Sequence, residues 1–409
     1  MAERIFVFVV CGAREHIDTL HFSLRALRKF TQRPIWVVTD SRRNEIPVDW
    51  EKIIEGNPPE HYTHHQAGIW MKTGLHRILP SGNQYCYLDS DVVALSESVN
   101  EIFSHYLPPV SFSTDHCRLN AFSPYAVKCD CRNRYHADQK KLDDSLAEYI
   151  TLTPEKREWI KQQQTLLGKL VKKSKENPIV YLGHIFRYYF SRTYYKLNDQ
   201  YWLHKKSKMW FTSDGQQITF DEEKMIRSIE TKTSFRYNFS TGNWSRQDGS
   251  LLSDMTCTHL HDQIRQTFQV EVKEKNWQHW NGGVFLFDDQ SYDFMESWFQ
   301  AGQKIFTLAD WETRDQGTLA MNVWKFNLQQ HPVIPIAYNF LADYGNEQLQ
   351  YKGNLTFAVG EKKQLIRPYF IHIYHQWGNI NWAVWQDVER HVFTADERDI
   401  IQQAKYSSS

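Results

Sequence analysis

Two aspartates, one residue apart, follow a short apolar run in the first quarter of the chain. The run Tyr85–Leu88 is aromatic or apolar at every position, which is typical of a strand buried on both faces of a parallel sheet. Asp89 and Asp91 stand at its carboxyl end, where open α/β sheets bind their ligands. Carboxylate oxygens there suit Mg²⁺ or Mn²⁺, which proteins often share with phosphate groups. The alternative is an ordinary Asp-Ser-Asp turn, because both residue types are common in turns.

Other polar residues with a chemical use lie in separate segments. Asn281 and two glycines open an apolar run, Asp315 and Gln316 begin an expected helix, and a late histidine pair follows an expected strand. Lys72 lies in a helical pattern before the Asp89 strand. Each has a structural alternative, respectively a turn, a helix cap, a structural histidine and a solvated lysine.

The elements that must position these residues alternate between strands and helices. Apolar runs and helical spacing predict a parallel strand–helix–strand unit in the first 40 residues, followed by a helix that stops at Pro80 and by the Asp89 strand. Sheet character returns near residue 280. The predicted strands are 4–11, 35–38, 85–88, 280–288 and 369–371, and the predicted helices are 17–30, 67–79, 291–303 and 314–324.

The block between residues 113 and 276 has a different character. A helix is predicted over 154–175 with Thr153 as its N-cap, and 209–220 is predicted to form a hairpin around Asp214-Gly215. The window 161–208 holds eleven Lys or Arg residues against two acids and is rich in aromatic rings. Such a segment could contact an anionic acceptor or a membrane surface. We favour the simpler interpretation, in which the rings pack inward and the lysines are solvated.

Composition limits the class of protein. Basic and acidic residues balance at 48 each, so the chain as a whole has no nucleic-acid signature. The first apolar run is too short for a signal sequence or a membrane span, and we expect a cytoplasmic protein with possible membrane association.

Six cysteines are too few for a disulfide framework in a chain of 409 residues. Cys129 and Cys131, with His116, Cys117 and His136 nearby, could hold zinc. Their spacing fits no standard zinc-binding motif, so zinc is the less favoured interpretation.

Four motifs occur in an order that resembles the GT-A-fold glycosyltransferases of family 8, which include glycogenin and bacterial lipopolysaccharide galactosyltransferases. Leu88–Asp91 matches the DxD metal motif of that family, and Asn281–Val284 matches its Asn-small-Gly-Val motif. Arg314–Gly317, with Leu319, matches its Asp-Gln segment, and His375–Gly378 matches its late His-x-x-Gly motif.

The resemblance covers residues 1–112 and roughly 277–385. This chain has Asn379–Trp382 where the family has Lys-Pro-Trp. The late histidine is ambiguous, because His372 directly follows the predicted strand and could replace His375 as the metal ligand.

The resemblance implies a role for each motif. Asp89, Asp91 and either His375 or His372 are the implied metal ligands, for Mn²⁺ or Mg²⁺. Asp315, Gln316 and Asn281 are the implied catalytic residues around the donor sugar. The implied donor-binding residues are Cys11, Gly12, Lys72, Ser90, Gly282, Gly283 and Gly378.

We therefore expect an α/β protein of the GT-A type, with a mixed, mostly parallel sheet flanked by helices and a large, mainly helical insertion. Residues 1–112 would form the nucleotide-binding half, 113–276 the insertion, which could bind the acceptor, 277–395 the acceptor and metal half, and 396–409 a tail.

The expected activity is metal-dependent transfer of a sugar from a nucleoside diphosphate donor, UDP in the first instance, to a glycan, lipid-linked or protein acceptor. The resemblance implies retention of the anomeric configuration. Two alternatives stay open at this stage. One is a nucleotide-sugar-binding protein without catalysis. The other is a sugar-nucleotide pyrophosphorylase, which would need a glycine-rich phosphate loop where residues 9–14 offer only Gly12.

Overall fold

The computed structural model describes residues 2–150, 154–219, 222–312, 315–343 and 349–394. The chain divides into two compact units, Met1–Cys129 with Thr256–Ser409, and Asp130–Met255. In the first unit the strands are β1 (Arg4–Val10), β2 (Ile35–Thr39), β3 (Ile53–Glu55), β4 (Gln84–Leu88), β5 (Val92–Ala94), β6 (Ser111–Arg118), β12 (Gln278–Phe287), β13 (Phe340–Leu341), β14 (Leu349–Gly353), β15 (Thr356–Val359), β16 (Gln364–Ile366) and β17 (Phe370–His372). Its helices are α1 (Arg14–Phe30), α2 (His64–Thr73), α3 (Leu75–Ile78), α4 (Leu119–Ala126), α9 (His259–Phe268), α10 (Tyr292–Ile305), α11 (Asp315–Lys325) and α12 (Ala383–Val392), with short 3₁₀ segments η1 (Glu97–His105), η2 (Asp289–Ser291) and η3 (Ile336–Tyr338).

The main sheet of the first unit has the strand order β3-β2-β1-β4-β12-β6 among the described residues. The first four strands run parallel, whereas β12 is antiparallel to both of its neighbours. The expected mixed, mostly parallel sheet flanked by helices is confirmed. The carboxyl ends of β1 and β4 lie next to each other at one edge of this sheet, because the two strands are parallel neighbours.

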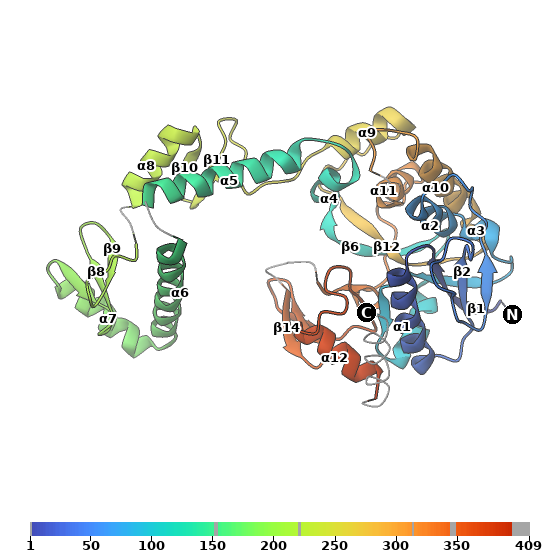
Figure 1. Ribbon diagram of the computed structural model, residues 1–409, viewed down its shortest axis with the longest axis horizontal. Coiled ribbons are helices and arrows are strands. Elements are labelled where there is room, and N and C mark those ends of the chain that lie inside the picture. Colours follow the sequence, from blue (N-terminus) through green and yellow to red (C-terminus); the bar gives the residue numbers. More distant parts are fainter. Residues whose placement is uncertain (1, 151–153, 220–221, 313–314, 344–348, 395–409) are drawn as a thin grey trace. The chain divides into compact units, whose positions relative to one another are not determined.

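Alternating residues of β1 build two separate cores, one on each face of the sheet. Val7 packs with residues of α2, α3, α10 and α11, whereas Phe6 and Phe8 pack with residues of α1 and η1. Figure 1 shows α2, α3, α10 and α11 gathered on one side of β1 and β2, and α1 on the other. Both faces of the central strands are therefore buried away from water, which explains why their sequences are continuous apolar runs.

The helix predicted over 67–79 is interrupted. Thr63 caps α2 by accepting from the backbone N of Gln66, and the helix ends at Gly74 before α3 begins. A Cβ at Gly74 would lie 2.7 Å from the carbonyl oxygen of Trp70 and 2.9 Å from the Phe299 ring. Only glycine fits between these groups, and this close packing fixes the position of α2 and of Lys72 near its end.

A small second sheet brings the late part of the chain to the Asp89 strand. Its order is β13-β17-β5, and His372 at the end of β17 pairs with Val92 at the start of β5. Because β5 begins one residue after Asp91, this pairing places His372 beside the two aspartates. A hairpin sheet (β14-β15-β16) and α12 pack on the remaining apolar residues of this region.

The second unit, Asp130–Met255, contains fewer residues than the insertion expected over 113–276. Residues 111–118 form β6, which pairs with β12 in the main sheet, and α9 packs against α4, so both flanks belong to the first unit. The elements of the second unit are α5 (Cys131–Ile150), α6 (Pro154–Glu176), α7 (Pro178–Phe190), β7 (Tyr194–Lys196), β8 (Tyr201–His204), β9 (Met209–Thr212), α8 (Glu222–Thr233), β10 (Arg236–Asn238) and β11 (Asn243–Ser245).

Inside the second unit the predicted helix and hairpin are partly found. Helix α6 begins at Pro154, while its expected cap Thr153 lies outside the described residues. The turn around Gly215 forms, with Gly215 N donating to Thr212 O at 2.9 Å. The main partner of β9 is β8, however, and among the described residues the expected return strand contributes one isolated bridge, between Phe211 and Gln217.

Helix α7 exposes its apolar residues rather than burying them. Ile179 is 82 % exposed, Tyr189 75 % and Phe190 80 %, and no residue of the helix is buried. The expectation that the rings of 161–208 pack inward therefore fails for most of α7. Tyr188 does pack against the core of this unit, which contains Tyr195 and Tyr201. Within the described part of the chain, no helix combines the length and the apolar character that crossing a membrane requires.

Candidate metal centre

Asp89, Asp91 and His372 form one cluster at the carboxyl end of β4. A potential ligand atom from each lies within 4.8 Å of the other two. Backbone hydrogen bonds hold the segment, because Asp89 N donates to Gly283 O at 2.8 Å and Ile373 N donates to Asp91 O at 3.1 Å. Strands β4, β12 and β17 thus position the three side chains together.

The His372 ring is oriented from both sides. Its Nε2 atom lies 3.2 Å from Asp91 Oδ1, and its Nδ1 atom lies 3.0 Å from Asn339 Oδ1. Asn339 uses its Nδ2 group to donate to Ser113 Oγ and Asn281 Oδ1. Its oxygen therefore accepts from Nδ1–H of His372, which leaves Nε2 directed at the cluster.

The hydrogen-bond chain continues away from His372 to a buried carboxylate. Asn281 Oδ1 accepts from Gly283 N at 2.8 Å, and Asn281 Nδ2 donates to Asp115 Oδ2 at 2.9 Å. Gln316 Nε2 donates to the same carboxylate oxygen at 3.0 Å, while Gln316 Oε1 accepts from Gly282 N at 2.7 Å. The donors and acceptors of the two amides are thus assigned by their partners, and the network fixes the glycine pair of β12.

Lys72 lies between two carboxylates. Its ammonium group is 3.1 Å from Asp89 Oδ1 and 2.7 Å from Asp315 Oδ2, and it lies 5.0 Å from the centre of the Tyr87 ring. The Tyr87 hydroxyl donates to Asp89 Oδ1 at 2.5 Å. The residue expected to touch the donor thus pairs with one expected metal ligand and one expected catalytic residue.

Burial and neighbouring charges act against each other on these groups. Burial alone would lower the pKa of Lys72, but the charges of Asp315 and Asp89 raise it above its ordinary value. Burial raises the pKa of Asp89 more than Lys72 lowers it. For Asp91 the order reverses, because the His372 partner holds its pKa below the ordinary value despite burial. Strongly perturbed groups that converge in this way are typical of functional sites.

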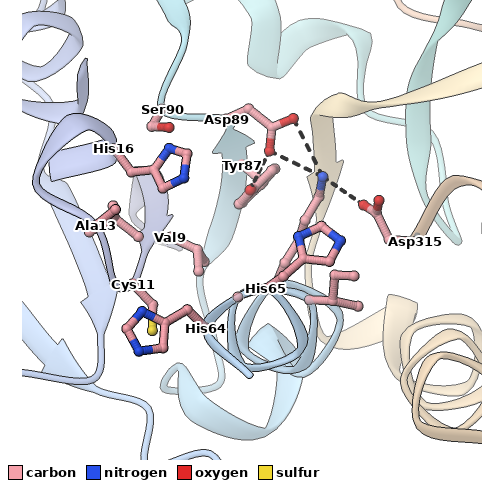
Figure 2. A pocket seen from close by; sticks show the side chains of 14 residues that line it. Val9, Cys11, Ala13, His16, His64, His65, Tyr87, Asp89, Ser90 and Asp315 are labelled. Atoms are coloured by element: carbon pink, nitrogen blue, oxygen red, sulfur yellow. Dashed lines mark hydrogen bonds and ion pairs between the residues drawn. The ribbon is translucent and has the colours of Figure 1, made fainter. Parts of the chain in front are cut away.

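A pocket of about 390 Å³ opens beside Asp89 and Lys72. Figure 2 shows Val9, Cys11 and Ala13 around the end of β1, His64 and His65 on α2, and Asp315 facing Asp89, with dashed lines from both carboxylates meeting at one ammonium group. The volume falls in the usual range for small-molecule sites.

The donor set fits a hard divalent cation. Two carboxylates and one imidazole nitrogen are common ligands of Mn²⁺, and carboxylates also suit Mg²⁺. Asp89, Asp91 and Asp315 together carry two more negative charges than Lys72 balances, which matches one divalent ion. The structure thus brings His372 to the two aspartates; His375 is exposed and its backbone N donates to Asp343.

The other residues expected at the site fall into two sets. Cys11, Lys72, Ser90, Asp89 and Asp315 line the pocket. Asn281 and Gln316 instead use their side chains in the network behind β12. Among the described residues, the pocket wall does not include these other expected site residues: Gly12, Gly282, Gly283, Asn281, Gln316, His375 and Gly378.

The comparisons with known proteins are weak. No protein-family model matches the sequence, and no curated protein matches it. The apo structure of the bifunctional glycosyltransferase WbbM matches at 10 % identity and a TM-score of 0.42, over 98 % of this chain and 51 % of that one. Mouse xyloside xylosyltransferase 1 matches at 10 % identity and a TM-score of 0.34, over 93 % and 98 %. The galactosyltransferase LgtC, solved with donor and acceptor sugar analogues, matches at 13 % identity and a TM-score of 0.20, over 27 % and 46 %.

This chain spans about half the length of the WbbM structure. At these identities and TM-scores the likenesses identify neither a substrate nor a family, so membership of family 8 stays a prediction.

Three residues of the site were not expected from the sequence. Asn339 contacts the His372 ring, and Asp115 contacts the Asn281 side chain, so both would affect a bound metal only through other residues. Tyr87 donates to Asp89, whereas its sequence context predicts only a buried strand residue. Asp115 lies inside β6, where mainly polar residues precede it, so it has no counterpart of the apolar run that precedes Asp89. For Asn339 no local pattern marks the residue.

Proposed function

We propose that this chain is a metal-dependent glycosyltransferase that uses a nucleoside diphosphate sugar, UDP-linked in the first instance, as its donor. The observation that carries the proposal is the cluster of Asp89, Asp91 and His372 at the edge of a pocket that also holds Lys72. A cation ligand set beside an ammonium group is a suitable environment for a diphosphate leaving group.

When bound, the divalent cation would supply Lewis-acid stabilisation of the negative charge on the departing diphosphate. Lys72 would add a point charge on the same side, because its ammonium group already lies among carboxylates at the pocket wall. Entry of a diphosphate would offer this ammonium group new anionic partners. Asp315 could then turn its carboxylate to the donor sugar or the acceptor.

The network behind β12 would keep the glycine pair and His372 in place. Gly282 and Gly283 carry no Cβ, and a Cβ at Gly282 would lie 2.9 Å from Gln316 Oε1 and 3.4 Å from Lys72 Nζ. The backbone can therefore approach the charged centre closely. Retention of the anomeric configuration and the nature of the acceptor are proposed only from the family resemblance.

The experiment is a donor screen with metal and site variants. Thermal unfolding would be recorded with UDP, GDP and their sugars, with and without Mn²⁺, and release of nucleoside diphosphate from each sugar nucleotide would be followed. We expect one donor class to raise the melting temperature and to be hydrolysed slowly, in both cases only with Mn²⁺. Asp91→Asn should abolish both effects, and Asp262→Asn, a surface aspartate paired with Arg265, serves as the matched control.

Undiminished activity of Asp91→Asn, or full activity in EDTA, would contradict the metal site. The Lys72→Met variant distinguishes binding of the cation from binding of the donor. Loss of the ammonium group should leave Mn²⁺ binding intact or tighter, because a competing positive charge is gone, while it weakens binding of the diphosphate.

The binding-protein alternative differs in one measurement. Asp315→Asn should leave UDP affinity nearly unchanged and lower sugar transfer or hydrolysis by about 10²–10³ if the protein is an enzyme. If wild-type protein binds UDP with Mn²⁺ but hydrolyses no sugar nucleotide and transfers no sugar, the binding-protein alternative is favoured. The pyrophosphorylase alternative has less support, because Gly12 packs against His64 rather than opening a glycine-rich loop.

A further inference from the structure

A second group of potential metal ligands lies beside α4, away from the pocket. Cys257 lies two residues before the start of α9, and its backbone N donates to Asn120 O at 3.0 Å. Ser123 Oγ lies 3.1 Å from Cys257 Sγ and also accepts from Leu260 N at 2.9 Å. Because Ser123 is fully buried, these contacts hold Cys257 in one position against α4.

Cys129 approaches the same point from the other end of α4. Lys128 N donates to Asp310 O at 2.9 Å, which fixes the segment just before it, and Cys129 Sγ lies 3.9 Å from Cys257 Sγ. This distance is nearly twice the ~2.05 Å of a disulfide bond. It agrees with two thiolates on one tetrahedral zinc ion, whose Zn–S distances of about 2.3 Å separate the sulfurs by about 3.8 Å.

Two further residues complete the group. Possible ligand atoms of Cys129, Cys131, Cys257 and His259 all lie within 4.8 Å of one another. Cys131 is two residues beyond Cys129, so the chain itself keeps its thiol within reach of a metal held by Cys129. His259 is the first residue of α9, and Cys257 precedes it by two.

We propose that Cys129, Cys131, Cys257 and His259 bind a structural zinc ion. Three thiolates and one imidazole are a standard ligand set for closed, tetrahedral zinc sites. The burial agrees with this role, since Cys131 is buried, Cys129 and Cys257 are half-buried, and His259 forms the solvent side. Binding would release the protons of the three thiols and join the two segments of the first unit that flank residues 130–255.

The two metal sites of the chain would select different ions. Asp89, Asp91 and His372 offer mainly oxygen ligands, which suit Mn²⁺ or Mg²⁺, whereas the thiolates of the cysteine group are soft ligands that prefer zinc. The zinc proposal is therefore independent of the proposed enzymatic activity. It also revises the sequence expectation, since the structure gathers His116 and Cys117 with Asp115 rather than in this group.

The test is metal analysis of the intact protein, purified reduced from zinc-supplemented medium and dialysed. We expect about one zinc ion per chain by mass spectrometry, and thiolate-to-metal charge-transfer absorption when Co²⁺ replaces it. Asp91→Asn should keep this zinc and the Co²⁺ spectrum. Cys117→Ser, a half-buried cysteine outside the group, is the matched control and should also keep both.

Cys257→Ser should lose the zinc ion and the charge-transfer band. If that variant does not fold, the His259→Ala variant tests the zinc proposal instead, because an exposed side chain can be removed without opening the core. Its zinc affinity, measured by competition with a chelator, should fall by more than the ~10–100-fold typical of lost outer-shell partners. Folded wild-type protein that carries no zinc and gives no Co²⁺ charge-transfer band would overturn the proposal. So would unchanged zinc affinity in His259→Ala, or a Cys129–Cys257 disulfide in the reduced preparation.

Discussion

Asn339 holds the His372 ring by accepting from its Nδ1 atom at 3.0 Å, and so directs Nε2 toward the aspartate pair. Asn339 is fully buried and donates to two further partners, so its amide cannot turn without breaking three hydrogen bonds. Histidines that bind metals commonly have their second nitrogen fixed in this way. Asn339 is thus expected to act as a positioning residue for the proposed metal ligand.

The first prediction tests this role. Asn339→Ala should weaken Mn²⁺ binding by about 10–100-fold, because the His372 ring loses the partner that fixes its tautomer and orientation. Donor hydrolysis should recover in part at high Mn²⁺ concentration, which a merely destabilised protein would not do. Asn322→Ala, equally buried in α11, controls for loss of a buried amide. Equal Mn²⁺ affinity in the two variants would exclude the positioning role.

The second prediction concerns the close packing of β12 against His372. A Cβ at Gly283 would lie 2.5 Å from His372 Cε1 and 2.9 Å from Asn281 Oδ1. Gly283→Ala should therefore displace the imidazole and abolish Mn²⁺-dependent donor binding, measured by calorimetry. Gly168→Ala in α6, where the space around the new methyl group is open, should leave Mn²⁺ binding unchanged and raise stability by up to ~1 kcal/mol. Normal Mn²⁺ affinity in Gly283→Ala would remove His372 from the metal site.

Most of the main sheet was predictable because its signals are local. The apolar runs of β1, β2, β4 and β12 and the apolar spacing of α1 and α10 each lie within one segment, and the structure has these elements within a few residues of the expected bounds. The break at Gly74 was not predicted, because it depends on the Phe299 ring far along the chain.

The site was predictable only where a motif is continuous. Asp89 and Asp91 follow from their strand, but the choice between His372 and His375 depends on the pairing of β17 with β5, which no sequence pattern encodes. The same limit applies to the cysteine group, since Cys129 and Cys257 are separated by the whole second unit. Contacts between segments far apart in the sequence, rather than local propensity, therefore place His372 near the aspartates and Cys129 near Cys257.

The third prediction addresses the possible membrane contact of 161–208. Helix α7 has no acidic residue and exposes Phe186 and Phe190, while exposed basic residues such as Lys172 and Lys175 precede it. We predict cosedimentation with vesicles that contain phosphatidylserine, and less with neutral vesicles or at high salt. The double variant Phe186→Ser, Phe190→Ser should lose this binding, whereas Tyr374→Ser, exposed in the first unit, should keep it. Vesicle binding that the double variant retains would refute a role for α7.

The fourth prediction is a pH dependence of stability that originates at His279. This side chain is fully buried beside Phe122 and, among the described residues, neither ring nitrogen has a hydrogen-bond partner. Burial lowers the pKa of His279 from 6.5 to about 4, and the nearby charge of Asp115 offsets only part of this effect. Between these two values the unfolded chain binds a proton that the folded protein does not, so the free energy of unfolding should fall as pH drops from 6.5 to 4. The decrease in the free energy of unfolding that His279 causes should total about 3 kcal/mol and stop below pH 4.

Urea unfolding of wild type and His279→Phe across this range should show the variant gaining stability relative to wild type on acidification, with exposed His61→Phe as the control. Parallel pH profiles for wild type and His279→Phe would mean that His279 is not held neutral in the folded protein.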